Sequence, residues 1–417
     1  MQPTVVAPAE VGFSAARLAR IRPAMQHYVD QGKIAGISTL IARRGKVLYR
    51  DQVGLMDKAT HTPMRDDAIF RIYSMTKPII CTALMTLYEE GKFHLFDPVA
   101  KYIPAFGAVK VLASDASGGQ RTVDPVRPIR VRDLFTHTAG LTYDFLVDSP
   151  VGELYREARL GNNIERTLEE MIHELARLPL AYQPGSRWHY SLSIDVLAHL
   201  IERLSNQPLR DFLQTNFFAP LGMVDTDFGV SAAKQTRLAA MYGRPDIVAV
   251  GSTFPLLMER WANGFNEPID VAATYPTDQP THFARGGHGL FSTIQDYLRF
   301  AQMLLNGGEL EGVRLLGRKT LELMHTNHLP AALLPYAIHG FPSLGYGFGL
   351  GSRVLMNVAD SALLGSVGEY GWAGAAKTYY WIDPQEQIIG ILMSQSMMGF
   401  DLPEKDFQLL TYQALVD

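Results

Sequence analysis

A serine and a lysine separated by two residues open an apolar stretch of this 417-residue chain. They are Ser74 and Lys77 in Ser74-Met75-Thr76-Lys77, and an apolar segment follows at residues 78–85. On a helix, side chains three positions apart share a face with their β-carbons roughly 5–6 Å apart, so Lys77 can hydrogen-bond to Ser74 Oγ. A serine hydroxyl needs such a base to act as a nucleophile. The spacing therefore predicts a serine nucleophile with an adjacent lysine base.

The tetrapeptide is weak by itself. Roughly one Ser-x-x-Lys is expected by chance in a chain of this length, and a second copy, Ser231-Ala232-Ala233-Lys234, is present. Serine is also a favoured helix N-cap, which explains either copy without catalysis. No partner motif follows Ser231, so we interpret it as a cap beside a solvated lysine. The role of Ser74 depends on partners elsewhere in the chain.

Two distant segments are the candidate partners. Tyr190 follows a Pro/Gly-containing approach at residues 183–189 and precedes an apolar helical pattern, which could hold its phenol rigidly in a cleft. A tyrosine there can share proton transfer with a lysine. Gly371-Trp372-Ala373-Gly374-Ala375 is rich in small residues and leads into a strand. Small residues let backbone N–H groups approach a substrate carbonyl closely.

Taken in order, Ser74-x-x-Lys77, Tyr190-Ser191-Leu192 and Trp372-Ala373-Gly374 resemble the motifs of the serine β-lactamase and penicillin-binding-protein superfamily, and within it the family VIII carboxylesterases. Segments 134–141, 219–223 and 345–351 are similar to the same family. The resemblance covers residues 14–415. It implies an α/β (α+β) chain with the β-lactamase-like fold, an antiparallel sheet flanked by helices with an inserted α-helical domain.

By this resemblance, Ser74 attacks an ester carbonyl while Lys77 and Tyr190 act as general base and acid; which of the two is the primary base stays open. The backbone N–H groups of Ser74 and Ala375 would form the oxyanion hole. Tyr143 either lines the cleft or only packs. The expected substrate-binding residues are Trp372, Ala373, Gly374, Tyr143 and Leu192.

Two departures from the β-lactamase pattern point to the substrate. Class C β-lactamases carry Tyr-x-Asn, and Leu192 stands where that amide would contact a β-lactam side chain. Their Lys-Thr-Gly becomes Trp372-Ala373-Gly374, so the cation that would meet a substrate carboxylate is missing. A neutral short-chain ester fits better than an anionic β-lactam. An alternative register on Lys377-Thr378 is disfavoured, because Tyr379 replaces the glycine needed for close backbone approach.

The elements that position these residues follow from hydrophobic periodicity. We expect an antiparallel hairpin at residues 36–42 and 46–53, a second pair of strands at 377–382 and 387–393, and mainly helical structure from about 97 to 265. The expected helices are 14–30, 168–177, 194–203, 209–217, 293–305 and 404–416. This order predicts a discontinuous α/β domain, residues 1–95 and 275–417, and a mainly α-helical domain, residues 96–274, with the active site in the cleft between them.

Composition and charge limit the classes of molecule that the protein is expected to bind. The chain is 47% hydrophobic and 19% charged with a net charge of -4, and it has no basic block for a phosphate backbone. We therefore expect a small-molecule partner, which the family resemblance makes an ester, and no nucleic acid. We interpret its single cysteine, Cys81, as a buried structural thiol, because it lies in an apolar run. Neither an export signal nor a membrane span is evident, so we expect a cytoplasmic enzyme. No cofactor is implied, and oligomeric state is not readable.

Other chemistries find less support. His137 and His288 could belong to a Ser-His-Asp triad, but the chain lacks Gly-x-Ser-x-Gly, so both are interpreted as structural. His173-Glu174-Leu175-Ala176-Arg177 misses the second histidine of a zincin motif, and no metal site is expected. Besides a carboxylesterase, the alternatives are an acyltransferase of the same fold, a β-lactamase or D,D-peptidase, and an inactive binding module.

Overall fold

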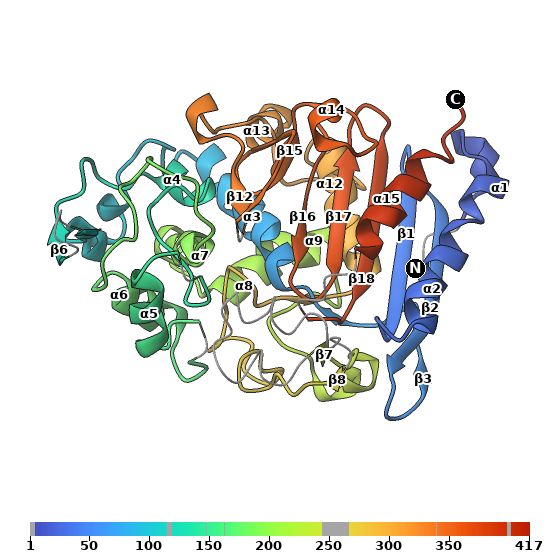
Figure 1. Ribbon diagram of the computed structural model, residues 1–417, viewed down its shortest axis with the longest axis horizontal. Coiled ribbons are helices and arrows are strands. Elements are labelled where there is room, and N and C mark those ends of the chain that lie inside the picture. Colours follow the sequence, from blue (N-terminus) through green and yellow to red (C-terminus); the bar gives the residue numbers. More distant parts are fainter. Residues whose placement is uncertain are drawn as a thin grey trace.

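The computed structural model describes residues 5–114, 119–146, 148–161, 163–243, 267–338, 340–397 and 402–417. In this part of the chain, eight strands form one antiparallel sheet built from both chain ends (Figure 1). The central pairing joins an N-terminal strand to a C-terminal one. The strands, in spatial order, are β14 (Tyr346–Phe348), β15 (Arg353–Leu355), β16 (Tyr370–Gly374), β17 (Thr378–Asp383), β18 (Ile388–Ser394), β1 (Gly36–Arg43), β2 (Lys46–Asp57) and β3 (Thr62–Pro63).

The sheet is covered on both faces. Successive residues of β1 alternate between two hydrophobic cores, with Ile37 and Ile41 in one and Leu40 and Ala42 in the other, as the two-residue period of a strand requires. Both cores exclude water, which explains why every residue of β1 is buried. A strand buried on both faces is a near-continuous apolar run, and this one supports the centre of the sheet.

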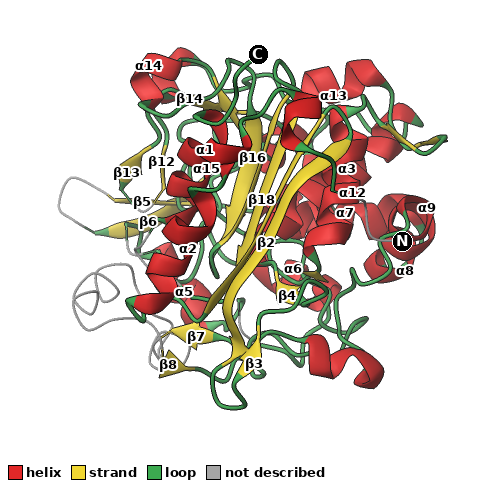
Figure 2. Cartoon of the chain, turned by 90° about the vertical axis from the view of Figure 1, so that its right-hand side faces the viewer, coloured by secondary structure: helices red, strands yellow, loops and turns green. Residues whose placement is uncertain are grey.

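Terminal helices cover one face and internal helices cover the other (Figure 2). On the first face lie α1 (Ala15–Leu18), α2 (Ile21–Asp30) and α15 (Pro403–Tyr412). On the second lie α3 (Thr76–Glu89) and α12 (Ile294–Leu305). The chain ends meet beside α1, since Phe13 and Leu415 form a β-bridge. The ends of the chain therefore close the fold together.

A mainly helical part lies to the side of the sheet (Figure 1). Its helix α7 (Ser193–Ser205) packs against α3 and so joins the two parts. The other helices are α4 (Val131–Phe135), α5 (Val151–Glu157), α6 (Leu168–Leu175), α8 (Leu209–Leu213), a π-helical turn (Gln214–Phe218) and α9 (Ala219–Leu221); α13 (Arg318–Met324) and α14 (Val358–Ser361) lie near the sheet.

Short elements complete the description. Two-residue strand pairs are β4 (Phe70–Arg71) with β9 (Phe291–Ser292), β7 (Tyr242–Gly243) with β8 (Glu267–Pro268), β10 (Glu309–Leu310) with β11 (Val313–Arg314), and β12 (Ala337–Ile338) with β13 (Phe341–Pro342); β5 (Val111–Ser114) pairs with β6 (Gln120–Val123). The 3-10 turns are Pro8–Val11, Tyr73–Met75, Val99–Lys101, Pro104–Gly107, Ala232–Arg237 and Ala331–Leu333.

Two predicted helices are shorter than expected. The helix expected at 14–30 is split into α1 and α2, because Pro23 has no N–H to donate to the carbonyl of Ala19. The helix expected at 404–416 ends at Tyr412. Beyond it, the N–H of Val416 donates to Gly12 O at 3.0 Å, so the last residues pair with the N-terminal segment instead of continuing the helix.

Strands were under-predicted. Strands β14, β15 and β16 extend the sheet beyond the predicted pair, and the Trp372-Ala373-Gly374 segment is itself the end of β16 instead of a lead-in to a strand. The hairpin of β5 and β6 lies in the region expected to be helical. These strands are only three to five residues long, so their β signal was weak.

None of the helices in the described ranges is long and apolar enough to cross a membrane. The predicted domain boundaries, residues 1–95 and 275–417 against 96–274, and the cytoplasmic location stay predictions.

Candidate active site

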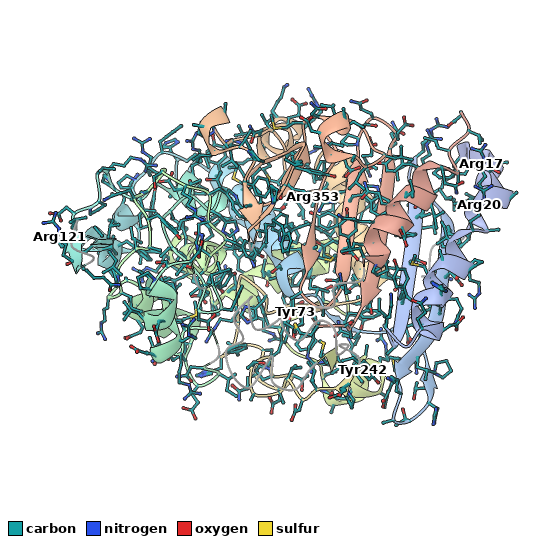
Figure 3. All side chains as sticks on the ribbon, in the orientation of Figure 1. Arg17, Arg20, Tyr73, Arg121, Tyr242 and Arg353 are labelled. Carbon is teal, nitrogen blue, oxygen red and sulfur yellow. The ribbon has the colours of Figure 1, made fainter. Side chains whose placement is uncertain are left out.

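Ser74 lies in the 3-10 turn Tyr73–Met75 that leads into α3. The N-cap of α3 is Met75, which makes no side-chain capping bond, so the hydroxyl of Ser74 is not used as a cap. Tyr73 has a φ of +44°, a left-handed conformation that costs a non-glycine residue about 1–3 kcal/mol. Tyr73 lies between the helical part and the sheet (Figure 3). The sharp turn leaves Ser74 half-buried at this junction, where its Oγ can meet other groups.

Lys77, in the first turn of α3, is the first partner of Ser74. Its Nζ donates to Ser74 Oγ at 3.0 Å and to Gly287 O at 2.6 Å. The side chain is only 2% exposed, so the two bonds hold it in a site that excludes water. The Nζ also lies 4.6 Å from the ring centroid of Tyr190, within the range of a cation–π contact. The predicted serine–lysine pair is therefore present as a hydrogen-bonded pair.

Tyr190 is the second partner. It stands three residues before α7, and its hydroxyl donates to Ser74 Oγ at 2.7 Å. Aromatic rings surround its phenol: His137 at 4.9 Å, Trp372 at 5.9 Å and a stacked Trp188 at 6.1 Å between centroids. Packing on several sides leaves the ring few alternative positions. The structure thus brings Ser74, Lys77 and Tyr190 together from two distant segments.

Strand β16 approaches the nucleophile through its last residues. A β-carbon added to Gly374 would lie 2.4 Å from Ile72 O and 2.2 Å from Thr378 Oγ1, so only glycine allows this approach. Ala373 is exposed, and Gly374 and Ala375 are half-buried. The segment predicted to offer a backbone N–H therefore lies beside the Ser74 turn and is accessible. The oxyanion role of Ser74 and Ala375 stays a prediction.

The Lys377 register does not point at the nucleophile. Lys377 has a φ of +61° in the turn between β16 and β17, and its Nζ lies 3.3 Å from Glu404 Oε1 at the start of α15. The sequence predicted that Lys377 begins the strand, but β17 starts one residue later, at Thr378. An ion pair with α15 holds this cation, which supports the Trp372 register.

Tyr143 and Leu192 are both buried, and Tyr143 packs against Tyr190 and Lys77. The ring of Tyr143 lies 5.2 Å from that of Tyr190 and 5.5 Å from Lys77 Nζ. Burial, together with Tyr190 and Asp195, raises the pKa of Tyr143 well above its usual value. Leu192 is 2% exposed at the N-cap of α7. Their predicted contacts with substrate stay predictions.

The two candidate triad histidines have other neighbours. His137 Nδ1 lies 3.2 Å from Ser191 Oγ, and burial and then Lys77 lower its pKa well below the usual value. His288 packs against Tyr275 at 5.8 Å, and burial lowers its pKa to about 3. Both rings are therefore neutral at pH 7. The hydrogen bonds found on Ser74 Oγ in the described residues come from Lys77 and Tyr190.

The second Ser-x-x-Lys has a different structure. Ser231 is the N-cap position of a 3-10 turn without a side-chain capping bond. Lys234 Nζ donates to Val224 O at 2.7 Å and lies 2.8 Å from Asp225 Oδ1, so this lysine is paired and not solvated as expected. The backbone N–H of Lys234 donates to Ser231 O at 2.8 Å, but among the described residues no hydrogen bond joins the two side chains. The copy therefore lacks the geometry of the first.

Cys81 is fully buried on α3, and burial raises the pKa of its thiol. His173 packs against His199 with 6.2 Å between centroids. Within the described ranges, no group of three or more His, Cys, Asp or Glu residues is arranged to hold a metal ion.

Sequence reasoning missed two residues of the site. Gly287 was not among the predicted site residues, yet its backbone O accepts from Lys77 Nζ. Asp195, five residues after Tyr190, is fully buried and accepts a bond from Gly287 N. The one available signal was an acidic residue inside the apolar pattern of residues 194–201.

A separate cavity of about 780 Å³ contains none of the predicted site residues. Tyr370, at the opposite end of β16 from Gly374, contributes to its wall. Arg44 and His325 line it as well. Ser74, Lys77 and Tyr190 therefore do not line this cavity.

Known proteins resemble this chain over nearly its whole length. The family model described as Beta-lactamase matches residues 21–413. An uncharacterised protein of Mycobacterium tuberculosis is 36% identical over 370 residues, covering 88% of this chain and 87% of the relative. Esterase EstB of Burkholderia gladioli is 29% identical and covers 90% of each chain.

Solved structures agree in fold. EstCE1, a hydrolase with promiscuous acyltransferase activity, superposes with a TM-score of 0.76 at 27% identity, over 95% of this chain and 99% of the other. The antiparallel sheet flanked by helices is thus the β-lactamase-like fold that the sequence predicted. The chain belongs to the Beta-lactamase family and is a serine hydrolase of the β-lactamase fold.

Proposed function

We propose that this serine hydrolase is a carboxylesterase of the family VIII type that hydrolyses short-chain carboxylic esters through an acyl-enzyme on Ser74. One observation carries the proposal: Ser74 Oγ accepts hydrogen bonds from both Lys77 Nζ at 3.0 Å and Tyr190 OH at 2.7 Å. A hydroxyl between two groups able to move protons is the arrangement that nucleophilic catalysis needs.

In the acylation step, Ser74 Oγ attacks the ester carbonyl carbon and its proton passes to the Lys77–Tyr190 pair. Negative charge develops on the carbonyl oxygen, where the backbone N–H groups of Ser74 and Ala375 would stabilise it. The pair then returns the proton to the alkoxide, which leaves as the alcohol. Two groups in contact with one oxygen can accept and donate in turn without moving far.

In the deacylation step, a water molecule attacks the acyl carbonyl, and the same pair takes its proton and returns it to Ser74. The acid is released and the enzyme regains its starting state. The reaction uses groups already bonded to Ser74 and no cofactor.

A neutral substrate fits the charges near the site. Trp372 replaces the cation of the β-lactamase motif, and Lys377 is held by Glu404. Lys77 already donates to Ser74 Oγ and Gly287 O. A substrate carboxylate would therefore find no unpaired cation among these residues, whereas the aromatic rings around Tyr190 would accommodate a small apolar ester.

The test is hydrolysis of p-nitrophenyl esters by Ser74→Ala and by Ser231→Ala as the matched control. Both change a serine in a Ser-x-x-Lys copy, but in the described residues only the Ser74 hydroxyl is hydrogen-bonded to a lysine and a tyrosine side chain. We expect Ser74→Ala to lose activity and Ser231→Ala to keep it. A folded Ser74→Ala enzyme with wild-type turnover would overturn the proposal.

Acyl transfer to an alcohol is the second candidate. It is favoured by the apolar aromatic rings of Trp188 and Trp372 packed around Tyr190, because a site poor in water favours transfer over hydrolysis, and by the similarity to EstCE1, a hydrolase with promiscuous acyltransferase activity. Product analysis with an added alcohol acceptor separates the two: ester products that dominate over free acid would favour transfer.

Turnover of a β-lactam is the third candidate. Nitrocefin hydrolysis at a rate comparable to ester hydrolysis would favour it over the esterase, despite Leu192 and Trp372 in place of the asparagine and lysine.

A further inference from the structure

A buried carboxylate, Asp195, is connected to Lys77 through the backbone of Gly287. Asp195, in the first turn of α7, is 0% exposed. Its Oδ1 accepts a hydrogen bond from Gly287 N at 3.0 Å, whereas its Oδ2 has no hydrogen-bond partner in the described part of the chain. Burying an incompletely partnered carboxylate is costly and needs a compensating role.

Gly287 links this carboxylate to the catalytic lysine. The N–H of the residue points to Asp195, and its carbonyl oxygen accepts from Lys77 Nζ at 2.6 Å. A β-carbon on Gly287 would lie 2.6 Å from Asp195 Oδ2 and 3.1 Å from Tyr143 OH, so the carboxylate and the phenol fit around a residue without a side chain. A continuous hydrogen-bonded path therefore runs from Asp195 through Gly287 and Lys77 to Ser74.

Charge adds to this path. Burial raises the pKa of Asp195, while the Gly287 N–H, Lys77 and Arg285 act to lower it. Arg285 and Tyr143 are the other titratable groups that interact with the carboxylate. Asp195 makes no direct ion pair among the described residues, so its charge acts on Lys77 across the Gly287 peptide. In a buried site of low dielectric, the carboxylate charge still stabilises the Lys77 ammonium across one intervening peptide group.

We propose that Asp195 is a positioning residue for proton transfer: it holds the Gly287 carbonyl that fixes Lys77 Nζ against Ser74 Oγ, and its negative charge balances the Lys77 ammonium. The inference rests on the proposed function and names a residue that acts through Lys77 without touching substrate.

The role predicts an effect on pH dependence as well as on rate. A negative charge near the Lys77–Tyr190 pair favours the protonated form of the pair. Its removal therefore favours loss of that proton, and the acidic limb of the kcat/KM profile should move to lower pH. A residue that only filled space in the core would not move this limb.

The variant Asp195→Asn tests the inference, because the amide keeps the size and one acceptor oxygen but removes the charge. Asp296→Asn is the matched control, a buried aspartate on α12 that accepts from Asp225 N and Thr226 Oγ1 and, in the described residues, makes no hydrogen bond to Ser74, Lys77 or Gly287. We expect Asp195→Asn to lower kcat by about tenfold to a hundredfold with KM little changed, and to move the acidic limb. Asp296→Asn should move neither.

Two results would overturn the inference: wild-type kcat with a wild-type pH profile in Asp195→Asn, or a lower kcat with the limb unmoved. If Asp195→Asn does not fold, Gly287→Ala decides, since the methyl group displaces the peptide from Asp195 and should lower kcat with KM little changed. Wild-type kcat in Gly287→Ala would contradict the role. Ser74→Ala tests the proposed function separately, so an active Ser74-dependent esterase with an unaffected Asp195→Asn variant refutes this inference alone.

Discussion

The hydroxyl of Tyr190 donates a 2.7 Å hydrogen bond to the Oγ of Ser74, across a sequence separation of 116 residues. Ser74 precedes α3, which packs beneath the sheet, and Tyr190 precedes α7 in the helical part. The packing of α7 on α3 therefore sets the distance between these two hydroxyl groups. A shift of 1 Å at this contact would weaken the alignment on which proton transfer depends.

Removal of the Tyr190 hydroxyl should impair proton transfer while leaving the ring in place. We expect Tyr190→Phe to lower kcat for p-nitrophenyl acetate by about 10²–10⁴-fold, the range typical of a general acid or base. The phenyl ring keeps its contacts with His137 and Trp372, so the melting temperature should change little. Steady-state kinetics with thermal unfolding checks both. Wild-type kcat in Tyr190→Phe would exclude the tyrosine from the mechanism.

The two lysines of the competing registers should behave differently. Lys77→Ala removes a group bonded to Ser74 Oγ and should lower kcat/KM by about 10²-fold or more. Lys377→Ala removes only a contact with Glu404, and its activity should stay near the wild type. The same ester assay measures both variants. A larger loss in Lys377→Ala than in Lys77→Ala would favour the rejected register.

A methyl group on Gly374 should disturb the Ser74 turn. In Gly374→Ala the new carbon would approach Ile72 O within 2.4 Å, so β16 or the turn must move. We expect kcat/KM to fall by about 10²-fold, since the oxyanion position moves with the strand. The matched control is Gly107→Ala, where the nearest atom is Ala100 Cβ at an ordinary 3.6 Å. Equal activity of the two variants would show that close approach at Gly374 is not needed.

Glu369 should make stability depend on pH. Burial raises its pKa to about 7, with Asp383 adding to the shift and Arg353, Tyr412 and Gln408 opposing it. The folded state thus binds the proton more tightly than the unfolded state, so the stabilisation is complete below about pH 4.5 and is lost as pH rises through about 7.

Urea unfolding at pH 5 and pH 8 tests this dependence. The free energy of unfolding of the wild type should fall between these pH values by roughly 2 kcal/mol more than that of Glu369→Gln, whose amide does not titrate. Gln408 and Tyr412 donate to Glu369 Oε2, and the amide oxygen can still accept from them. Identical pH dependence in both proteins would contradict the effect.

Much of the site could be predicted because chemistry restricts residue type. The proposed roles restrict the residue types: a nucleophile at Ser74, a proton acceptor at Lys77 and a residue without a side chain at Gly374. The order of these residues in the chain carried the family resemblance. The β-rich runs at 36–42, 46–53 and 387–393 predicted the centre of the sheet, since β propensity is a local property of the sequence.

The rest depends on tertiary contacts that leave little local signal. Gly287 contributes through its backbone, so its side chain reveals nothing of its bond with Lys77. Strand β14, Tyr346–Phe348, is short and flanked by glycines, and it pairs only because β15 lies beside it. The paired state of Lys234 required knowing that Asp225 lies 2.8 Å away.

The central claim is that Ser74 carries the acyl group, and mass spectrometry of the enzyme quenched during turnover of p-nitrophenyl acetate tests it most directly. The account predicts a mass increase of one acetyl group, located by peptide mapping on the peptide that contains Ser74 and absent from Ser74→Ala. Rapid hydrolysis by the wild type with acetyl on another residue, or equal hydrolysis by folded Ser74→Ala, would contradict it.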